Sequence, residues 1–281
     1  MNLTQFRTLW GVSEPIDVAI GRALDAGYSG IESRVPTTVE ATQALAESLQ
    51  RQQTPWIAEI CTGGDYVPPQ HLTPAEHLAD LATNLDRCVD LKPLHINCLG
   101  GVDAWDEPTS VAFLRAGMVM AAERGLSFSF ETHRSRILFN PWVTQRLIAE
   151  VPELRLTADI SHWCVVAERL MDADQAPIQA IASRVDHIHA RVGYDQGAQV
   201  PHPAAPEYQH CLASHQRCWE LFWQAQAKAG CTDFTLTPEF GPDGYLHCLP
   251  FTQMPVADLF AVNVWMAETE HAHFARWQQS R

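Results

Sequence analysis

Eight short runs rich in β-branched and aromatic residues alternate with longer segments of helical period, and this alternation most narrowly limits the fold. The expected strands are 6–10, 30–34, 56–61, 94–98, 126–131, 154–159, 185–189 and 234–239. The expected helices are 15–26, 38–52, 73–91, 110–124, 141–150, 178–184, 211–229 and a last one from 256 towards 277. Eight strand-then-helix units predict a closed parallel (β/α)8 TIM barrel of the α/β class.

The local signals agree with one barrel domain over residues 1–281. Pro stands in the first turn of SEPIDVAIGRALDAG, and LTPAEHLADL carries an S/T-x-x-E capping pattern. An open doubly wound sheet would need a glycine-rich phosphate loop after its first strand, and TLWGVSEP contains none. The long irregular stretches 193–208 and 241–255 follow the seventh and eighth strands, so we expect both over the C-terminal mouth, where barrel active sites lie.

The charge balance disfavours polyanionic partners. The chain has 33 acidic and 19 basic residues, a formal net charge of −14, and no Lys/Arg run. We therefore expect neither nucleic acid nor an anionic membrane surface as a partner. No leader-like start and no apolar run of roughly 20 residues is present, so a cytoplasmic location is expected. The eight cysteines form no C-x-x-C pair and are interpreted mostly as small buried hydrophobic residues.

Side chains alternate along a strand, so the last inward residue of each strand can be predicted. In LSFSFE, Phe128 and Phe130 point outward under helices and Glu131 points into the barrel. The same parity turns Asp159 and Glu239 inward. The remaining inward residues are expected to be Glu32, Glu59, His95, Asn97, His187, His189 and Arg191.

Glu131, Asp159 and Glu239 are thus expected around one axis, where buried like charges cannot all stay ionised unaided. A divalent cation would resolve the conflict, with His189 as the fourth ligand. A mixed oxygen and nitrogen set without thiolates suits Mn²⁺, Mg²⁺, Co²⁺ or Zn²⁺. The alternative is that each acid is neutralised separately by a salt bridge or by a helix N-terminus.

The segments FETHR, ADISHW, HIHAR and TPEFG, in this order, resemble the xylose isomerase-like TIM barrels, a superfamily that includes sugar epimerases, inosose dehydratase, hydroxypyruvate isomerase and endonuclease IV. The resemblance covers essentially the whole chain in its strand order. It implies one divalent metal ion held by Glu131, Asp159, His189 and Glu239. It also implies that His162 contacts the substrate or supports the metal ligands.

Three departures limit what the resemblance implies. Endonuclease IV-like members carry extra histidines on the third and fourth strands, where this chain offers Glu59 and either His95 or Asn97, so a three-zinc DNA-repair site is not expected. Ketose 3-epimerases have an acid six residues after the first metal-binding Glu and an Arg six residues after the metal-binding His, where this chain has Ile137 and Asp195. The loop RVGYDQGAQVPHPAAPEY resembles a subgroup described only as sugar isomerase or epimerase.

Several further residues are candidates for binding the substrate. The predicted substrate-binding residues are His162, Arg191, His133, Arg134, Glu59, Asn97 and His202. For His133, Arg134 and His202 a solvated loop position is the competing interpretation. Tryptophans 10, 105 and 163 follow strand ends and either stack on a sugar ring or pack in the core.

Two other groups of residues are not assigned to the site. The residues Trp219, Phe222 and Trp223 have helical spacing, which indicates core or a subunit interface. We interpret His271 and His273 as solvent-exposed residues of a polar C-terminal helix.

The expected function is a metal-dependent isomerase or epimerase that transfers a proton next to the carbonyl of a sugar or polyol-derived small molecule. Glu131 and Glu239 would exchange the proton, and His162 would orient the substrate. The alternatives are a dehydratase or lyase on the same site, a two-carboxylate glycosidase, and a catalytically silent sugar-binding barrel. A phosphorylated substrate is less favoured because the site segments contain no Lys. Homo-oligomer formation is left open.

Overall fold

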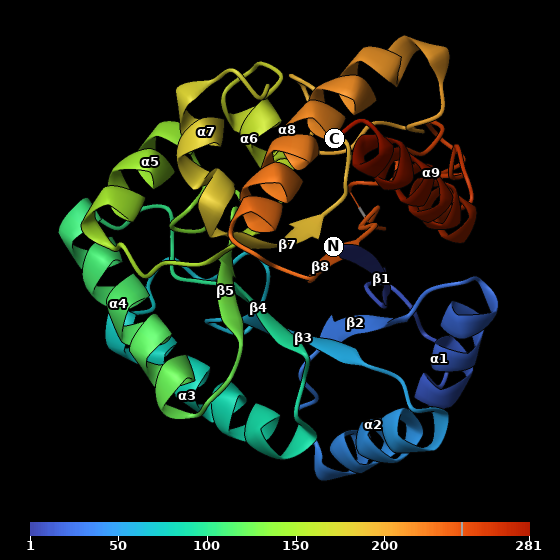
Figure 1. The fold of residues 1–281 in the computed structure, drawn as a ribbon. Coiled ribbons are helices and arrows are strands. Elements are labelled where there is room, and N and C mark those ends of the chain that lie inside the picture. Colours follow the sequence, from blue (N-terminus) through green and yellow to red (C-terminus); the bar gives the residue numbers. More distant parts are fainter. Residues whose placement is uncertain (243) are drawn as a thin grey trace.

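The computed structural model describes residues 1–242 and 244–281, and its strands form a closed parallel barrel in sequence order (Figure 1). The strands are β1 (Asn2–Thr8), β2 (Gly30–Arg34), β3 (Trp56–Cys61), β4 (His95–Leu99), β5 (Phe128–Glu131), β6 (Leu156–Ala158), β7 (Val185–His189) and β8 (Asp233–Thr237). Pairing of β1 with β8 closes the barrel. The predicted TIM barrel is therefore confirmed.

The helices lie around the outside of the barrel (Figure 1). They are α1 (Ile16–Asp25), α2 (Val39–Gln52), α3 (Pro74–Leu91), α4 (Glu107–Glu123), α5 (Pro141–Glu150), α6 (Ser161–Val166), α7 (Ala176–Ile181), α8 (Gln209–Lys228) and α9 (Leu259–Gln279), with short 3-10 helices η1 (Ala182–Arg184) and η2 (Pro206–Tyr208). Thr73 and Glu76 form the predicted capping box at the start of α3. Every helix in the described part of the chain is too short or too polar to cross a membrane.

Some element boundaries differ from the prediction for local reasons. The first strand starts at Asn2 and ends at Thr8, because residues 2–5 pair with β8 although they lack a β-rich composition. Helix α4 begins at Glu107, three residues early, because Asp106 caps it and Pro108 fits its first turn. Helix α6 was not predicted and begins two residues after Asp159. These changes leave the order of the elements intact.

The inward and outward faces follow the predicted alternation. The Phe130 ring packs 5.9 Å from Phe113 of α4, outside the barrel. The Ser129 hydroxyl lies inside, 2.7 Å from His95 Nε2 and 2.6 Å from Thr157 Oγ1. A layer of small polar side chains and histidines thus fills the barrel below the strand ends.

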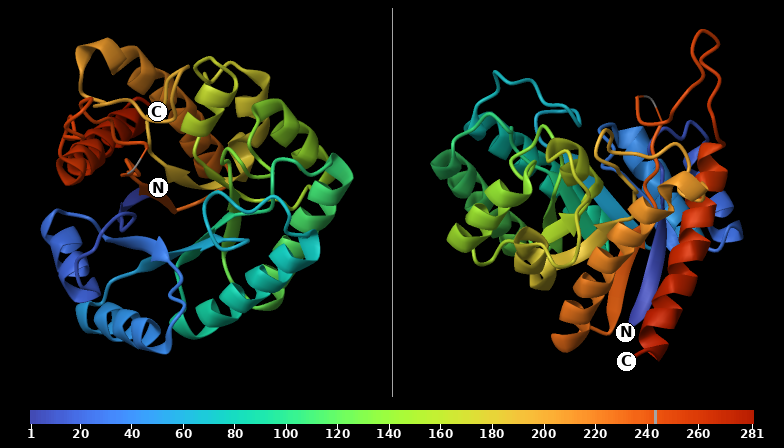
Figure 2. Two further views of the ribbon diagram at one scale, coloured as in Figure 1. Left: turned by 180° about the vertical axis from the view of Figure 1, so that it is seen from behind. Right: turned by 90° about the horizontal axis from the view of Figure 1, so that it is seen from above.

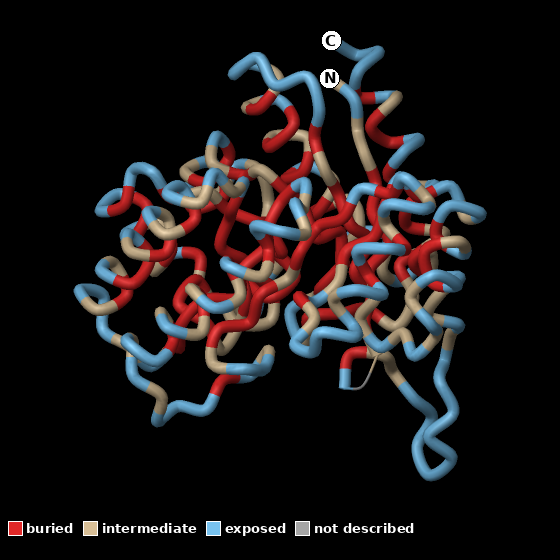
Figure 3. Tube along the Cα trace, turned by 90° about the horizontal axis from the view of Figure 1, so that it is seen from below, coloured by how far each residue is buried: buried red, intermediate tan, exposed pale blue. Residues whose placement is uncertain are grey.

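The two long loops after β7 and β8 contact one another. The Gln199 side chain accepts a hydrogen bond from Gly241 N (2.8 Å) and donates one to Gly241 O (3.3 Å). Further along, Cys248 and Pro255 form an isolated antiparallel bridge, and the tip between them, including the fully exposed Phe251, projects from the body (Figures 2 and 3). The second loop therefore has a part packed beside the barrel mouth and a part directed into solvent.

The aromatic cluster Trp219, Phe222 and Trp223 is buried core, and six of the eight cysteines are buried. The prediction for His273 was wrong. This residue is buried between α8 and α9, where its ring lies 2.8 Å from Glu220 Oε1 and 2.9 Å from Glu270 Oε2. His271 is exposed, as expected. Helical spacing alone did not reveal that α8 covers one of the two histidines.

Candidate metal centre and active site

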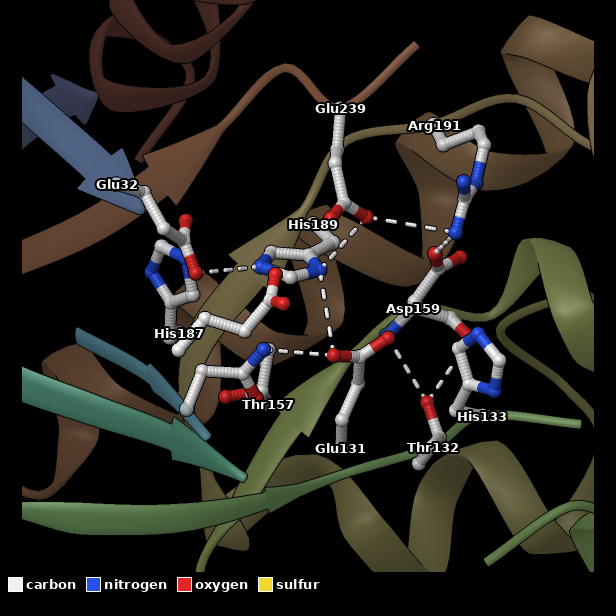
Figure 4. A network of polar contacts seen from close by, with 12 residues as sticks. Glu32, Glu131, Thr132, His133, Thr157, Asp159, His187, His189, Arg191 and Glu239 are labelled. Atoms are coloured by element: carbon white, nitrogen blue, oxygen red, sulfur yellow. Dashed lines mark hydrogen bonds and ion pairs between the residues drawn. The ribbon is translucent and has the colours of Figure 1, made fainter. Parts of the chain in front are cut away.

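The carboxyl ends of four consecutive strands bring together the four predicted metal ligands (Figure 4). Glu131 is the last residue of β5, Asp159 follows β6, His189 ends β7, and Glu239 lies two residues beyond β8. Each offers one ligand atom, and these atoms all lie within 4.8 Å of one another. All four residues are buried, so three carboxylates and one imidazole share a space screened from water.

Glu32 of β2 orients the His189 ring. One carboxylate oxygen of Glu32 lies 2.9 Å from His189 Nε2, and the other lies 3.2 Å from His187 Nε2. The His187 ring is held on its other side by Thr235 Oγ1 at 2.8 Å. If His189 donates its Nε2 proton to Glu32, its Nδ1 lone pair faces the other three candidate ligands, an arrangement typical of metal-binding histidines.

Two buried atoms at the centre of the cluster have no hydrogen-bond partner among the described residues. They are His189 Nδ1 and Glu239 Oε2, which lie 2.8 Å apart without the geometry of a hydrogen bond. Buried polar atoms are almost always satisfied, and an unsatisfied pair facing one point requires an explanation. A cation bound between them would supply it, so the donor set fits a divalent metal ion.

The carboxylates of this cluster carry opposite pKa shifts. Burial raises the pKa of Glu239 to about 7, although His189 and Arg191 act against the rise. For Glu131, burial is outweighed by the positive charge of His189 and by the hydrogen bond from Asn97, and the pKa is lowered to about 2. The pKa of His189 is well above its usual value because the surrounding carboxylates outweigh its burial. The surroundings thus shift the pKa values of Glu131 and Glu239 in opposite directions.

Arg191, two residues beyond His189, enters the same cluster. Its Nη2 contacts Asp159 Oδ2 at hydrogen-bond distance and lies 3.3 Å from Glu239 Oε2. The other oxygen of Asp159 accepts hydrogen bonds from the amide and the hydroxyl of Ser161, the first residue of α6. The unpredicted short helix therefore positions the carboxylate of a candidate metal ligand.

A cavity of about 430 Å³ opens beside the cluster. Its wall includes Glu131, Glu239 and Arg191, together with Glu59 of β3 and His133. The aromatic part of the wall comes from Trp10 and Tyr66. A pocket of this volume with convergent polar groups at one end suits a small polar ligand.

Three of the predicted substrate-binding residues lie at the cluster or the cavity besides Arg191. Asn97 donates a hydrogen bond of 2.6 Å to Glu131 Oε2, so it holds the carboxylate of a candidate metal ligand in place. Glu59 lines the cavity and pairs with Arg34 at 3.1 Å. Burial raises the pKa of Glu59, against the effect of Arg34. His133 lines the cavity in front of His162.

The three other predicted residues do not line the cavity. His162 is fully buried on α6, with its ring 3.9 Å from that of His133 and its Nε2 2.8 Å from Arg191 Nη2, so it contacts the cluster and not the cavity. The Arg134 guanidinium stacks on Tyr245 at 4.8 Å. His202 packs against Trp265 of α9, outside the lining of this cavity. Of the two roles expected of His162, the structure shows its contact with the residues of the candidate metal cluster, and its ring lies behind that of His133.

Of the three tryptophans, Trp10 lines the cavity. Trp163 is buried and donates a hydrogen bond of 2.9 Å to Leu138 O, and Trp105 packs against His77 and Phe113, so both belong to the core. The sequence interpretation missed Tyr66 and Tyr245. Both lie on loops, and their position depends on loop packing that strand alternation does not predict.

Two other groups of acids and histidines lie within the same spacing. Glu32, His187 and His189 form one, and Glu131, His133 and His162 form the other. In the first, Glu32 bridges both rings by hydrogen bonds, so its oxygens are already used. In the second, burial lowers the pKa of His133 to about 4 and that of His162 well below its usual value. The four-residue group alone combines three carboxylates with an unsatisfied nitrogen.

Comparison with known proteins gives structural matches only. No protein-family model matches the chain, and the search of curated proteins returned no match. Among solved structures, L-ribulose 3-epimerase matches with a TM-score of 0.65 and 13% identity, covering 99% of this chain and 96% of that one. A xylose isomerase-like TIM barrel protein from Mycobacterium smegmatis in complex with magnesium matches with a TM-score of 0.65 and 12% identity over 96% and 97% of the chains.

A third structure, 3-keto-D-glucoside 4-epimerase from E. coli, matches with a TM-score of 0.60 and 12% identity over 99% of this chain and 100% of that one. The resemblance to the xylose isomerase-like TIM barrels is therefore confirmed at the level of the fold. At these identities the likeness does not extend to individual residues.

Proposed function

We propose that the protein is a divalent-metal-dependent isomerase or epimerase acting by proton transfer next to the carbonyl of a sugar or polyol-derived substrate. The observation that carries this proposal is the buried set of Glu131, Asp159, His189 and Glu239 beside the 430 Å³ cavity. The structural neighbours named above include two epimerases of sugars or keto-sugars and one magnesium complex, which supports the same class.

In this proposal the four residues hold the cation, whose chemistry is Lewis-acid polarisation of a carbonyl and an adjacent hydroxyl. Glu131 and Glu239 line the cavity from β5 and from the segment after β8, so their carboxylates approach a ligand from different strands. One removes the proton at the carbon next to the carbonyl and the other returns it. Asn97 holds Glu131, and the hydrogen bond from Asn97 leaves one Glu131 oxygen free.

The cavity wall supplies the contacts that orient the substrate. Glu59 and His133 offer hydrogen-bonding groups, and Trp10 and Tyr66 offer aromatic faces on which a sugar ring packs. The burial of the four residues keeps the site that would hold the cation away from bulk water. His162 supports the cluster by holding Arg191 and is not assigned a substrate contact.

The test is Glu239→Gln in the metal-replete protein. We expect turnover to fall by about 10²–10⁴-fold, the usual loss for a proton-transfer group, while circular dichroism and thermal unfolding stay close to wild type. Glu153→Gln removes an exposed carboxylate and serves as the matched control. Turnover is measured as solvent deuterium entering ketopentoses, ketohexoses and keto-glucosides, followed by mass spectrometry. A metal-replete Glu239→Gln protein with wild-type turnover would contradict the assignment.

Product mass separates the proposed reaction from its nearest alternative. Isomerisation and epimerisation conserve mass, whereas a dehydratase on the same site yields a product lighter by one water. A chelator should abolish the proposed activity and leave a two-carboxylate glycosidase unaffected. A silent binding barrel would exchange no deuterium with any sugar that it binds.

A further inference from the structure

Arg191 places a permanent positive charge inside the ligand cluster (Figure 4). It is 1% exposed, and a guanidinium does not lose its proton in proteins. Its Nη2 contacts Asp159 Oδ2 and lies 3.3 Å from Glu239 Oε2, so one nitrogen spans two of the four proposed metal ligands. The carboxylates hold this charge firmly and raise the pKa of Arg191.

Both carboxylate oxygens of Asp159 already have partners within the protein. Its Oδ1 accepts from Ser161 N at 3.0 Å and from the Ser161 hydroxyl, which fixes the carboxylate at the start of α6. Its Oδ2 is the oxygen that Arg191 holds, and His162 Nε2 lies 3.5 Å from the same oxygen. A metal ion reaching Asp159 together with Glu239 Oε2 and His189 Nδ1 therefore meets the space and the oxygens that Arg191 Nη2 occupies.

We propose that the Arg191 guanidinium and the divalent cation compete for Asp159 and Glu239, so that metal binding displaces Arg191 towards the cavity. This inference rests on the metal site of the proposed function. Two positive groups in one buried cluster repel strongly, because the low local dielectric increases their Coulomb energy. The same two carboxylates therefore neutralise one cation at a time.

In its present position, held by Ser161 Oγ at 3.2 Å from Nε, the guanidinium already has neighbours that would stabilise it after a shift towards the cavity. Arg191 Nη1 has no hydrogen-bond partner among the described residues, so that side of the group is not fixed. The Tyr245 ring lies 4.6 Å and the Trp10 ring 5.6 Å from the guanidinium carbon, and both aromatic faces stabilise a cation. Arg191 also lines the 430 Å³ cavity. Once released, its donors face a bound substrate, and substrate oxygens accept from them.

The competition is tested by titrating metal-free protein with Mn²⁺ in a calorimeter. We expect Arg191→Met to bind Mn²⁺ on the order of 10- to 100-fold more tightly than wild type, within the usual range of coupling between two binding events. The matched control is Arg34→Met. It removes one positive charge from the same cavity wall, where Arg34 pairs with Glu59, which is not a proposed ligand. The control should stay close to wild type.

Thermal unfolding gives a second readout. Without its internal cation, the metal-free Arg191→Met protein should unfold at a lower temperature than wild type, and Mn²⁺ should raise its midpoint by more. If that variant is unfolded until Mn²⁺ is added, the competition is likewise supported, and Arg191→Lys then provides the affinity comparison with its charge retained.

Two outcomes separate this inference from the proposed function. If wild type binds Mn²⁺ and Arg191→Met binds it no more tightly than Arg34→Met, the competition is wrong while the metal site stands. If neither wild type nor Arg191→Met binds Mn²⁺, Co²⁺ or Zn²⁺, the metal site fails and the competition fails with it. If Arg191→Met binds Mn²⁺ and wild type does not, the competition is supported, because Arg191 then excludes the metal completely.

Discussion

Two layers of the barrel interior both contain buried polar side chains, yet they differ in how their polar groups are satisfied. In the lower layer, His95 is held by Ser127 Oγ at 2.8 Å and by Ser129 Oγ at 2.7 Å, and burial lowers its pKa to about 4. In the upper layer, His189 faces carboxylates, and its pKa is well above the usual value. Buried polar side chains inside a barrel therefore do not by themselves indicate a binding site. Several buried carboxylates with unsatisfied oxygens do indicate one.

The largest difference between the two layers is expected when one histidine of each layer is replaced by Gln. His189→Gln should weaken Mn²⁺ binding by at least about 100-fold, since even groups that only orient metal ligands cost 10–100-fold. His95→Gln should lower the free energy of unfolding by about 1–3 kcal/mol, the cost of disturbing buried hydrogen bonds, with Mn²⁺ affinity close to wild type. Calorimetry and urea unfolding measure the two quantities. Equal loss of metal affinity in both variants would show that the layers are not distinct.

A smaller effect is expected where the two layers meet. Glu32 links His187 and His189, so Glu32→Gln leaves an amide that accepts from only one of the two rings. We expect Mn²⁺ affinity to fall by about 10–100-fold, as for other groups that orient a metal-binding histidine. Glu59→Gln removes one carboxylate from the neighbouring strand of the same cavity and serves as control. If both variants lose affinity equally, the effect is one of net charge and not of ring orientation.

The smallest effect concerns a histidine between acids outside the barrel. Glu270 and Glu220 raise the pKa of His273 against its burial. Because the folded pKa exceeds the unfolded value, this contribution is fully present below about pH 6.5 and is lost as pH rises through the folded pKa. His273→Gln should therefore cost about 0.5–1.5 kcal/mol at pH 5.5 and less at pH 9, measured by urea unfolding. If the stability lost in His273→Gln instead increased with pH, the raised pKa of His273 would be wrong.

The sequence predicted the fold and the grouping of the four candidate ligands because both depend on periodicity. Strand alternation turned Glu131, Asp159 and Glu239 inward, and the structure brings them together with His189. It did not predict that Glu32 orients His189, because the contact joins β2 to β7 across the barrel. The sequence left open whether His162 contacts the substrate or supports the metal ligands, and α6 places its ring beside Arg191 at the cluster.

Other parts of the site depend on contacts between loops, which no periodicity encodes. Tyr245 reaches Arg191 only because residues 239–242 follow a fixed path beyond β8. Gly241 is required on that path, since a Cβ there would lie 1.9 Å from the Trp10 ring. The sequence contains both Trp10 and Gly241, but their contact forms only when the loops after β1 and β8 pack together.

The backbone that carries Glu239 lies outside the regular ladder, because β8 ends at Thr237. The two residues that follow Glu239, Phe240 and Gly241, are nevertheless fixed by side-chain amides. Asn263 of α9 exchanges two hydrogen bonds of 2.9 Å with Phe240, and Gln199 makes a similar pair with Gly241. The conformational entropy of this segment is therefore lost during folding and not when a ligand binds. Two side-chain amides thus hold the backbone that carries Glu239 in place before any ligand enters the cavity.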